Sequence, residues 1–202
     1  MIVRLWLRLV YWTFTSAKRK NVAYSGTVQM KMSQVEPCSP VVAVERRIVI
    51  QAPVEQVFGY VADLRNDRDW RQEINGTALD AAQPGLGVIA TEDACLSAKL
   101  PHSITTLVYE AYEPNQYIRC SSTADSPVWT CVERSFTPLS PSVTEFVYTL
   151  QFEQQVVQRA LGFAPPLWFL RWYSGWMMQR YLRKLQTLLE ERIYDTSKHV
   201  AS

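Results

Sequence analysis

The side chains that could do chemistry in this sequence form none of the standard catalytic motifs. There is no Gly-x-Ser-x-Gly nucleophile turn, no His-Glu-x-x-His metal motif and no glycine-rich phosphate loop. The chain has only two histidines, His102 and His199. His102 follows Pro101 in an expected hairpin turn, which favours an exposed loop residue over a general base. We therefore predict neither a serine triad nor a zinc-bound water, and no catalytic residue is assigned.

The four cysteines indicate neither a metal site nor a disulfide framework. Cys38, Cys95, Cys120 and Cys131 contain no Cys-x-x-Cys pair and no companion histidines. Because a structural zinc needs four close nitrogen or sulfur ligands, no metal is predicted, and no motif predicts an organic cofactor. We interpret the cysteines as thiols in a reducing compartment, mostly packed as small apolar side chains. This interpretation favours a cytoplasmic location.

Polar side chains on the expected strands could still support a reaction. A cyclase or dehydratase could hold a flexible chain in one conformation and polarise it with a few buried arginine, tyrosine or carboxylate groups. For the charged candidates a position on the solvent face is favoured, and for the tyrosines core packing is favoured. The candidates are Glu92, Tyr109, Arg119, Glu133, Arg134 and Tyr148.

A row of tryptophans is the other conspicuous group. Trp168, Trp172 and Trp176 are spaced at four residues, so they share one flank of a helix, close to Met177 and Met178. Three uses remain open: the wall of a cavity for a bulky apolar ligand, an exposed patch for a dimer or for anionic lipid, or packing against a sheet. We favour packing against a sheet.

Composition limits the class of protein. The 202 residues are 48% hydrophobic and 20% charged, which predicts one globular domain with a sizeable core. No uncharged apolar run of about 18 residues exists, so an integral membrane protein is excluded. The formal charge is +2, but six of the 21 basic residues and none of the 19 acidic residues lie in residues 1–35. The remaining chain is mildly acidic, which argues against nucleic-acid binding.

Residues 1–40 are predicted to form a basic N-terminal extension. Its first part is apolar but interrupted by arginines, and Lys18 to Lys20 follow it, which is the wrong order for a secretory signal. It could be an organelle transit peptide, or an interfacial helix with Trp6 and Trp12 at the headgroups. It could also be translated upstream sequence, with Met30 or Met32 the true start. We favour this third reading, and a disordered extension is the plainest alternative.

From residue 41 onward the hydrophobic pattern predicts regular elements. Val42–Ile50 is β-branched and leads through Pro53 into a short helix that ends near Asp63. A polar loop, 65–69, follows. Strands are then expected at residues 74–81, 87–98, 103–113, 116–123, 128–138 and 143–155, separated by turns. Short links between consecutive strands require antiparallel neighbours.

The last strand and a long C-terminal helix should enclose the core. Every second residue of the strand, including Phe146 and Tyr148, shares one face, which is core or cavity. The stretch Leu167–Tyr194 has no proline and predicts a helix of about 40 Å. Its apolar stripe at helical spacing comprises Leu167, Leu170, Ser174, Met177, Tyr181, Leu185 and Leu188.

The order of elements, together with several motifs, resembles a known superfamily. The main motif runs from Val44 to Asn66 and is followed by Trp70; weaker echoes lie at residues 109–114, 136–145 and 185–190. Over residues 43–192 the chain resembles the START-related, Bet v 1-like (SRPBCC) superfamily, in its polyketide cyclase/dehydrase-like branch. The resemblance implies an α+β helix-grip fold, in which a curved antiparallel sheet wraps around a long C-terminal helix. The domain would span residues 41–195, with a tail at 196–202.

The resemblance also implies a function. A curved sheet that does not fully seat against the last helix leaves a cavity for a small hydrophobic molecule, such as a lipid, a quinone or a polyketide-like compound. The alternatives are a cyclase or dehydratase, and a protein-interaction module. Peripheral membrane contact could involve the N-terminal arm or the tryptophan row, and the oligomeric state is not assigned. The expected ligand-binding residues are Trp70, Tyr109, Phe146, Tyr148, Leu170, Ser174, Met177 and Tyr181.

Overall fold

The computed structural model describes residues 37–200, with side chains described as far as residue 192. Most of the expectations for the N-terminal extension, including the interfacial helix at Trp6 and Trp12 and the start at Met30 or Met32, lie outside the described residues.

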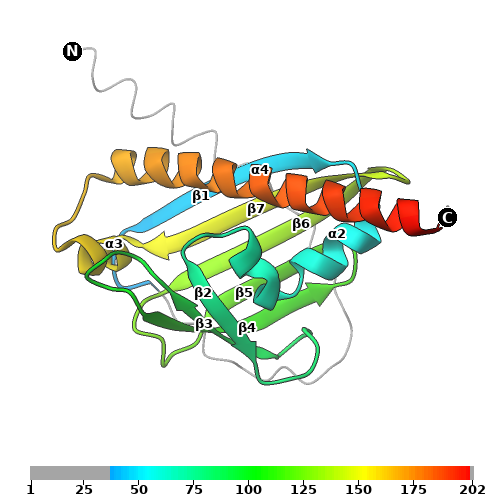
Figure 1. The fold of residues 1–202 in the computed structure, drawn as a ribbon. Coiled ribbons are helices and arrows are strands. Elements are labelled where there is room, and N and C mark those ends of the chain that lie inside the picture. Colours follow the sequence, from blue (N-terminus) through cyan, green and yellow to red (C-terminus); the bar gives the residue numbers. More distant parts are fainter. Residues whose placement is uncertain (1–36, 201–202) are drawn as a thin grey trace, which may run out of the picture. The chain divides into compact units, whose positions relative to one another are not determined.

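A seven-stranded antiparallel sheet forms the body of the described chain (Figure 1). The strand order is β1-β7-β6-β5-β4-β3-β2, so every strand after β1 pairs with its sequence neighbour and β7 returns to pair with β1. The antiparallel pairing predicted from the short links is confirmed. The strands are β1 Val41–Ile50, β2 Ile74–Leu79, β3 Ile89–Ala94, β4 Ser103–Glu113, β5 Tyr117–Ser122, β6 Thr130–Ser140 and β7 Val143–Glu153.

Four helical segments accompany the sheet: α2 (Val54–Val61), the 3-10 helix η1 (Leu64–Asp69), α3 (Gln154–Leu161) and α4 (Leu167–Val200). Helix α4 packs on β1 and crosses the sheet, with α3 near its amino-terminal end and α2 near its other end (Figure 1). This is the expected α+β helix-grip fold. Within the described residues, α4 included, no helix is both long and apolar enough to cross a bilayer.

Two predicted element boundaries are wrong in an instructive way. The last strand was expected to reach residue 155, but β7 ends at Glu153 and the next residues form α3. Helix α3 ends at Gly162, whose φ of 85° is the left-handed conformation that glycine adopts at the end of a helix. The predicted helix from Leu167 begins as expected but continues to Val200, beyond Tyr194.

The core lies between the inner face of the sheet and one side of α4. Phe146 and Tyr148 of β7 point into it, as the alternation predicted. As far as residue 192, the buried apolar side chains of α4 are Leu170, Met178, Leu182, Leu185 and Leu189, and Gly175 is buried as well. This set is rotated from the predicted stripe, of which only Leu170 and Leu185 are fully buried.

The tryptophan row does not pack against the sheet, so the use that the sequence favoured is wrong. Trp168, Trp172 and Trp176 are 71%, 62% and 48% exposed. They lie on the side of α4 that faces away from the buried residues, because the buried positions occupy the opposite flank of the helix.

Candidate ligand-binding site

The 3-10 helix η1 carries a carboxylate into the interior of the protein. Asp63 caps η1 by accepting a hydrogen bond from the backbone nitrogen of Arg65 at 3.0 Å. One turn later Leu64 and Asp67 face inward and are buried, and Trp70 closes the segment against the sheet. The segment that was expected to be a polar loop therefore has one side that faces the interior, and Asp67 is the charged residue on that side.

Arg134 of β6 is the main partner of Asp67. Its guanidinium donates to Asp67 Oδ1 at 2.9 Å, to Asp67 Oδ2 and to the carbonyl oxygen of Val61. The same group lies 5.4 Å from the ring centroid of Trp70 and 5.3 Å from that of Tyr148. Arg134 is fully buried, so these contacts replace water around its charge. This pair fastens η1 to the sheet.

Arg71 connects Asp67 to two further carboxylates. Its Nη1 donates to Asp67 Oδ2 at 3.0 Å and to Glu92 Oε2 at 3.1 Å, and its Nε donates to Glu73 Oε1 at 2.9 Å. Two arginines therefore face three carboxylates, and four of the five side chains are buried. We call Asp67, Arg71, Glu73, Glu92 and Arg134 the charged cluster.

Burial and charge act against each other on these groups. For Glu92, burial raises the pKa, the charge of Arg71 opposes it, and the net pKa is raised. For Arg134, burial alone would lower the pKa, but the Asp67 carboxylate outweighs it and the pKa is raised. Burial also raises the pKa of Tyr148, so its hydroxyl keeps its proton. The cluster therefore holds two permanent cations, Arg71 and Arg134, and one carboxyl group, Glu92, whose pKa is raised.

Hollows lie on the helix side of the sheet, next to the charged cluster. One, of about 430 Å³, has walls from Arg71, Glu73, Tyr148 and α4. A second, of about 210 Å³, is bounded by Arg71, Glu73 and Glu92 and by α3. A third, of about 440 Å³, is lined almost entirely by apolar side chains of α3 and the start of α4. They adjoin one another because they share lining residues, among them Leu96, so we call them together the cavity.

Five of the eight expected ligand-binding residues line this cavity. Tyr148, Ser174, Met177 and Tyr181 border the 430 Å³ part, and Leu170 borders the 440 Å³ part. Ser174, Met177 and Tyr181 are three of the five half-buried members of the predicted stripe, and these three line the cavity. The hydroxyl of Tyr181 faces Glu73; burial and this carboxylate raise its pKa.

The other three expected residues are packed behind the cavity. Trp70 stacks edge-on against Tyr148 at 5.7 Å between centroids. Phe146 stacks on Tyr148 at 6.3 Å and is fully buried. The hydroxyl of Tyr109 donates to the carbonyl of Ala62 at 2.9 Å and accepts from the backbone nitrogen of Leu64 at 3.3 Å. These three side chains therefore hold the cavity wall in place.

The expectation that the charged strand residues lie on the solvent face is wrong for two of them. Glu92 and Arg134 point inward and are buried, because Asp67 and Arg71 supply partners that the sequence pattern did not reveal. Arg119 and Glu133 fit the expectation better: both are partly exposed and lie 2.7 Å apart in an ion pair away from the cluster.

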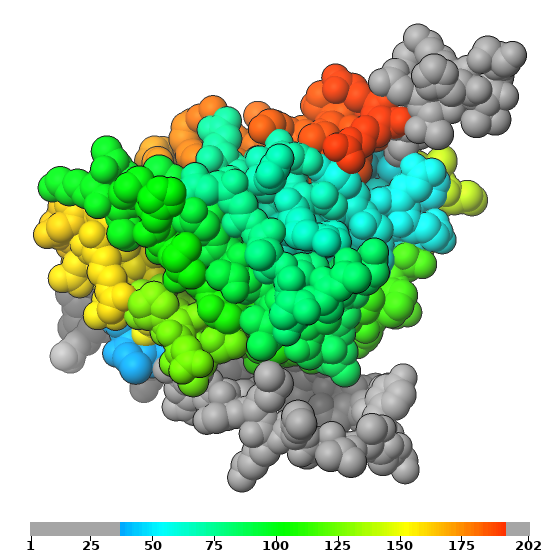
Figure 2. All heavy atoms as spheres, turned by 60° about the horizontal axis from the view of Figure 1, so that its bottom comes forward, coloured from blue at the N-terminus to red at the C-terminus, as the bar shows by residue number. Residues whose placement is uncertain are grey.

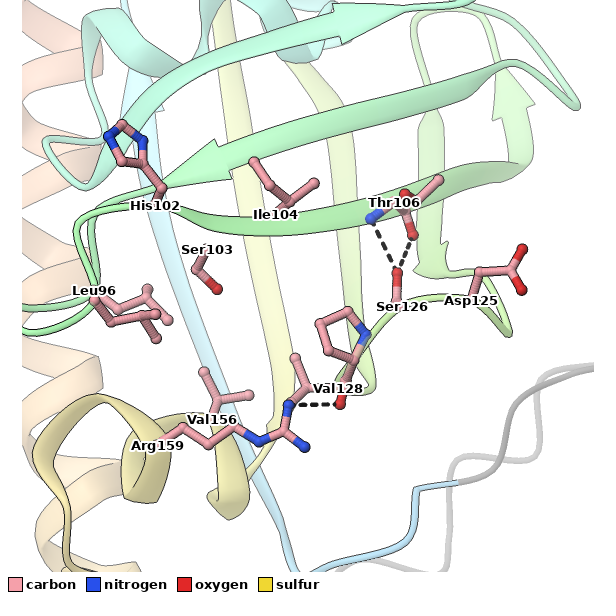
Figure 3. Close-up of a pocket in the computed structure, with 12 residues that line it drawn as sticks. Leu96, His102, Ser103, Ile104, Thr106, Asp125, Ser126, Val128, Val156 and Arg159 are labelled. Carbon is pink, nitrogen blue, oxygen red and sulfur yellow. Dashed lines mark hydrogen bonds between the residues drawn. The ribbon is translucent and has the colours of Figure 1, made fainter.

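A further hollow of about 500 Å³, which shares Leu96 and Val156 with the cavity, lies between β4, the β5–β6 loop and α3 (Figure 3). His102 stands at its edge with its ring turned away from the centre, and it is exposed as predicted. Two of its polar side chains are already paired: Ser126 bonds both backbone groups of Thr106, and Arg159 bonds the carbonyl of Pro127. None of the five residues of the charged cluster lines this hollow, so it lacks the polar end that the cavity has.

Sequence reasoning missed Asp67, Arg71 and Glu73, and only a weak signal could have identified them. Residues 65–69 are polar throughout, which is typical of an exposed loop. The signal is the spacing of Leu64, Asp67 and Trp70 at three residues, which places all three on one side of a 3-10 helix. An acid between two large apolar residues on the same side indicates a buried carboxylate that needs a cation.

Comparison with solved structures shows the same fold in several proteins. A START superfamily protein from Mycobacterium smegmatis is 16% identical, with a TM-score of 0.58 over 74% of this chain and 97% of its own. The Zhui aromatase/cyclase from Streptomyces sp. R1128 is 16% identical, with a TM-score of 0.58 over 76% and 96%. A protein from Deinococcus radiodurans is 17% identical, with a TM-score of 0.56 over 73% and 96%. No curated protein sequence matches this chain.

The sequence itself matches one family model, described as polyketide cyclase / dehydrase and lipid transport, over residues 41–190. This range includes every strand, the charged cluster and the cavity-lining half of α4. The resemblance to the START-related superfamily is thereby confirmed, and the chain belongs to the polyketide cyclase / dehydrase and lipid transport family.

Proposed function

We propose that the chain binds a neutral amphipathic small molecule in the cavity, with the polar end of the ligand at Arg71 and Tyr148 and its apolar body between α3 and α4. The apolar part of the cavity is lined by side chains such as Val157, Phe169 and Leu170. Ligand sites of this kind are largely apolar, with a few polar groups that fix the orientation. Lipids, quinones and polyketide-like compounds all combine an apolar body with a polar end.

The hydroxyl of Tyr148 is the observation that carries the proposal. Tyr148 is 1% exposed, and its hydroxyl has no hydrogen-bond partner among the described residues. An unpaired buried hydroxyl costs about 1–3 kcal/mol. Other buried polar atoms also lack a partner, for example Nε1 of Trp70, but Trp70 does not line the cavity. Tyr148 does line the cavity, together with Arg71, and in the proposed complex both side chains donate to one oxygen of the ligand.

The charges around the cavity favour a neutral polar group over an anion. The charged residues that line its polar end are Arg71, Glu73 and Glu92, one cation against two carboxyl groups. Behind them Arg134 and Asp67 neutralise one another. An added carboxylate would face like charges in a poorly solvated site, whereas a ketone, quinone or hydroxyl oxygen accepts hydrogen bonds without that repulsion.

Isothermal titration with a matched pair of ligands tests this function. Decyl-benzoquinone and decanoate have the same apolar chain and differ in their polar end. We expect the quinone to bind at least about tenfold more tightly, and Tyr148→Phe to weaken it about fivefold to tenfold, which is the value of one hydrogen bond. Tyr117→Phe, on β5 away from the cavity, is the control and should bind as wild type. If neither compound binds, the proposed function is wrong; equal binding refutes the argument from charge.

A second candidate function, cyclisation with loss of water, is favoured by the raised pKa of Glu92. Arg71 and Tyr148 could polarise a ketone while the carboxylate of Glu92 removes a proton from the neighbouring carbon. In such an aldol step a carbon–carbon bond forms and the carbonyl oxygen takes a proton; water then leaves. Chromatography of a linear poly-β-ketone after incubation with the wild type and with Glu92→Gln tests it. A cyclised, dehydrated product that appears faster only with the wild type supports turnover; equal rates exclude a role for Glu92.

A further inference from the structure

Helix α4 carries exposed aromatic side chains along its first half. Trp168, Trp172, Tyr173 and Trp176 form what we call the aromatic strip, and all four are exposed. The rings contact one another through Phe169, which lies 6.0 Å from Trp168, 5.9 Å from Trp172 and 6.1 Å from Tyr173. Tyr173 is in turn 6.1 Å from Trp176. The strip is therefore one continuous apolar surface, which soluble proteins rarely expose without a partner.

The charged side chains of the segment that carries the strip all have one sign. From Gln154 to Leu189 the sequence contains no aspartate or glutamate. The basic residues of this stretch are Arg159, Arg171, Arg180, Arg183 and Lys184, and all are exposed. The guanidinium of Arg180 lies 4.9 Å from the ring centroid of Trp176, so cation and strip adjoin directly. Glu73 approaches α4 through Tyr181, but from the cavity side.

The strip is continuous with the apolar end of the cavity. Phe169 and Tyr173 line the 440 Å³ part and also contact the tryptophans. Leu161 and Phe163, between α3 and α4, border the same part and are exposed. Figure 2 shows the α3 region, in yellow, at one end of the described surface next to the orange first part of α4. The cavity therefore opens beside the strip.

We propose that the aromatic strip and its basic neighbours dock on a bilayer that contains anionic phospholipid, and that the ligand passes between the bilayer and the cavity at Phe163 and Tyr173. Tryptophan and tyrosine rings suit the headgroup level, and exposed arginine and lysine side chains attract anionic headgroups. A second copy of the chain is the competing occupant. In such a dimer the five basic residues of one copy would face the same five of the other, because the stretch holds no acid to pair with them.

The docking part of this inference rests on the surface alone; the passage of ligand rests on the proposed function. The two parts can fail separately. A protein that binds vesicles but takes up no quinone would retain docking and lose the proposed function. A protein that binds soluble quinone but no vesicle would lose the docking.

Vesicle sedimentation with the full chain tests the docking. The vesicles are phosphatidylcholine with about 30% phosphatidylserine, or phosphatidylcholine alone. Replacement of Trp168, Trp172 and Trp176 by alanine should lower partitioning to the anionic vesicles at least about 30-fold. The matched control replaces three exposed apolar residues elsewhere, Leu86, Ile104 and Leu139, and should partition within about twofold of wild type. All variants keep residues 1–36, so any binding by that basic segment is common to them.

Two further variants separate charge from cavity. Arg180→Gln with Arg183→Gln should weaken binding about tenfold on anionic vesicles and leave binding to phosphatidylcholine unchanged. Ser174→Trp, which places a large ring in the cavity, should abolish uptake of decyl-benzoquinone from vesicles while vesicle binding stays as in wild type.

Three results overturn the docking. They are a wild type that does not bind anionic vesicles, a tryptophan variant that binds within about twofold of wild type, and a tryptophan variant that converts a dimer to a monomer in sedimentation velocity without a change in vesicle binding. The last result would assign the strip to contact between copies. Circular dichroism of each variant checks the fold. It should be unchanged in the tryptophan and arginine variants, because the side chains replaced there are exposed.

Discussion

Two buried tyrosines, on strands β4 and β7 of the sheet, allow a direct test of the site. Tyr109 and Tyr148 are 0% and 1% exposed. The Tyr109 hydroxyl makes two hydrogen bonds, to Ala62 and from Leu64, whereas the Tyr148 hydroxyl makes none with the described residues; Tyr148 lines the cavity and Tyr109 does not. Replacing each by phenylalanine removes one oxygen and almost no volume. The two variants therefore differ in the bonding of the lost hydroxyl.

The expected effects on stability have opposite signs. Tyr109→Phe leaves a buried carbonyl and a buried amide without their partner, which should lower the free energy of unfolding by about 2–4 kcal/mol. Tyr148→Phe removes a hydroxyl that is desolvated and unpaired, so the free energy of unfolding should stay the same or rise by up to about 1 kcal/mol. The ring contact of residue 148 with Arg134, at 5.3 Å, is kept by phenylalanine.

Urea denaturation followed by circular dichroism measures both values, and titration with decyl-benzoquinone measures the ligand affinity of each variant. The reasoning requires that Tyr148→Phe lose affinity without losing stability. If Tyr148→Phe unfolds as easily as Tyr109→Phe, its hydroxyl has a structural role and the site argument fails. If it keeps both stability and full affinity, the cavity does not use this hydroxyl.

Three further predictions concern the cluster, the thiols and α4. Burial raises the pKa of Glu92 above its ordinary value of 4.5. The contribution of such a group to stability is complete below about pH 4.5 and is lost as the pH rises. In urea titrations the free energy of unfolding of wild type minus that of Glu92→Gln should therefore fall as the pH rises above about 4.5, and a rise would contradict the prediction. Burial raises the pKa of Cys120 to about 12 and that of Cys131 to about 11. At neutral pH, Ellman's reagent should therefore react quickly with only Cys38 and Cys95 of the native protein. Four rapidly reacting thiols would refute this prediction. A methyl group on Gly175 would meet the guanidinium of Arg46. Gly175→Ala should therefore leave the free energy of unfolding nearly unchanged in wild type, but raise it by about 1 kcal/mol in a protein that also carries Arg46→Ala. A double-mutant cycle in urea measures the difference, and equal effects in both backgrounds would refute the contact.

The fold could be predicted where local pattern and tertiary packing require the same thing. The strand up to Ile50, the helix after Pro53 and the antiparallel meander follow from residue periodicity and short links, and each is observed. Helix α3 could not be predicted in this way. Val156 and Val157 are β-branched and come soon after a strand, so local propensity does not indicate a helix there. In the structure they line the cavity together with Leu96 and Leu170, an arrangement that exists only once the sheet and α4 have come together.

The site was predictable in its apolar half and not in its charged half. Alternation along β7 and helical spacing along α4 identify Tyr148, Ser174, Met177 and Tyr181, because one face of each element must be apolar or half-buried. No periodicity identifies Asp67, since an acid in a polar run is normally solvated. Its burial requires Arg134, 67 positions away, and that pairing exists only once the sheet has formed.

The charged cluster is itself an argument for a ligand. A buried ion pair contributes little net stability, because desolvation of both charges offsets their attraction, and apolar side chains of similar volume often serve as well. Stability therefore explains the Arg134–Asp67 pair only as a fastening for η1. It does not explain Glu92 and Arg71, which border the polar end of the cavity. There Glu92 has a raised pKa, and the guanidinium of Arg71 has a further hydrogen-bond donor. Side chains that are costly to bury and that face open volume are better explained by a polar group that they bind.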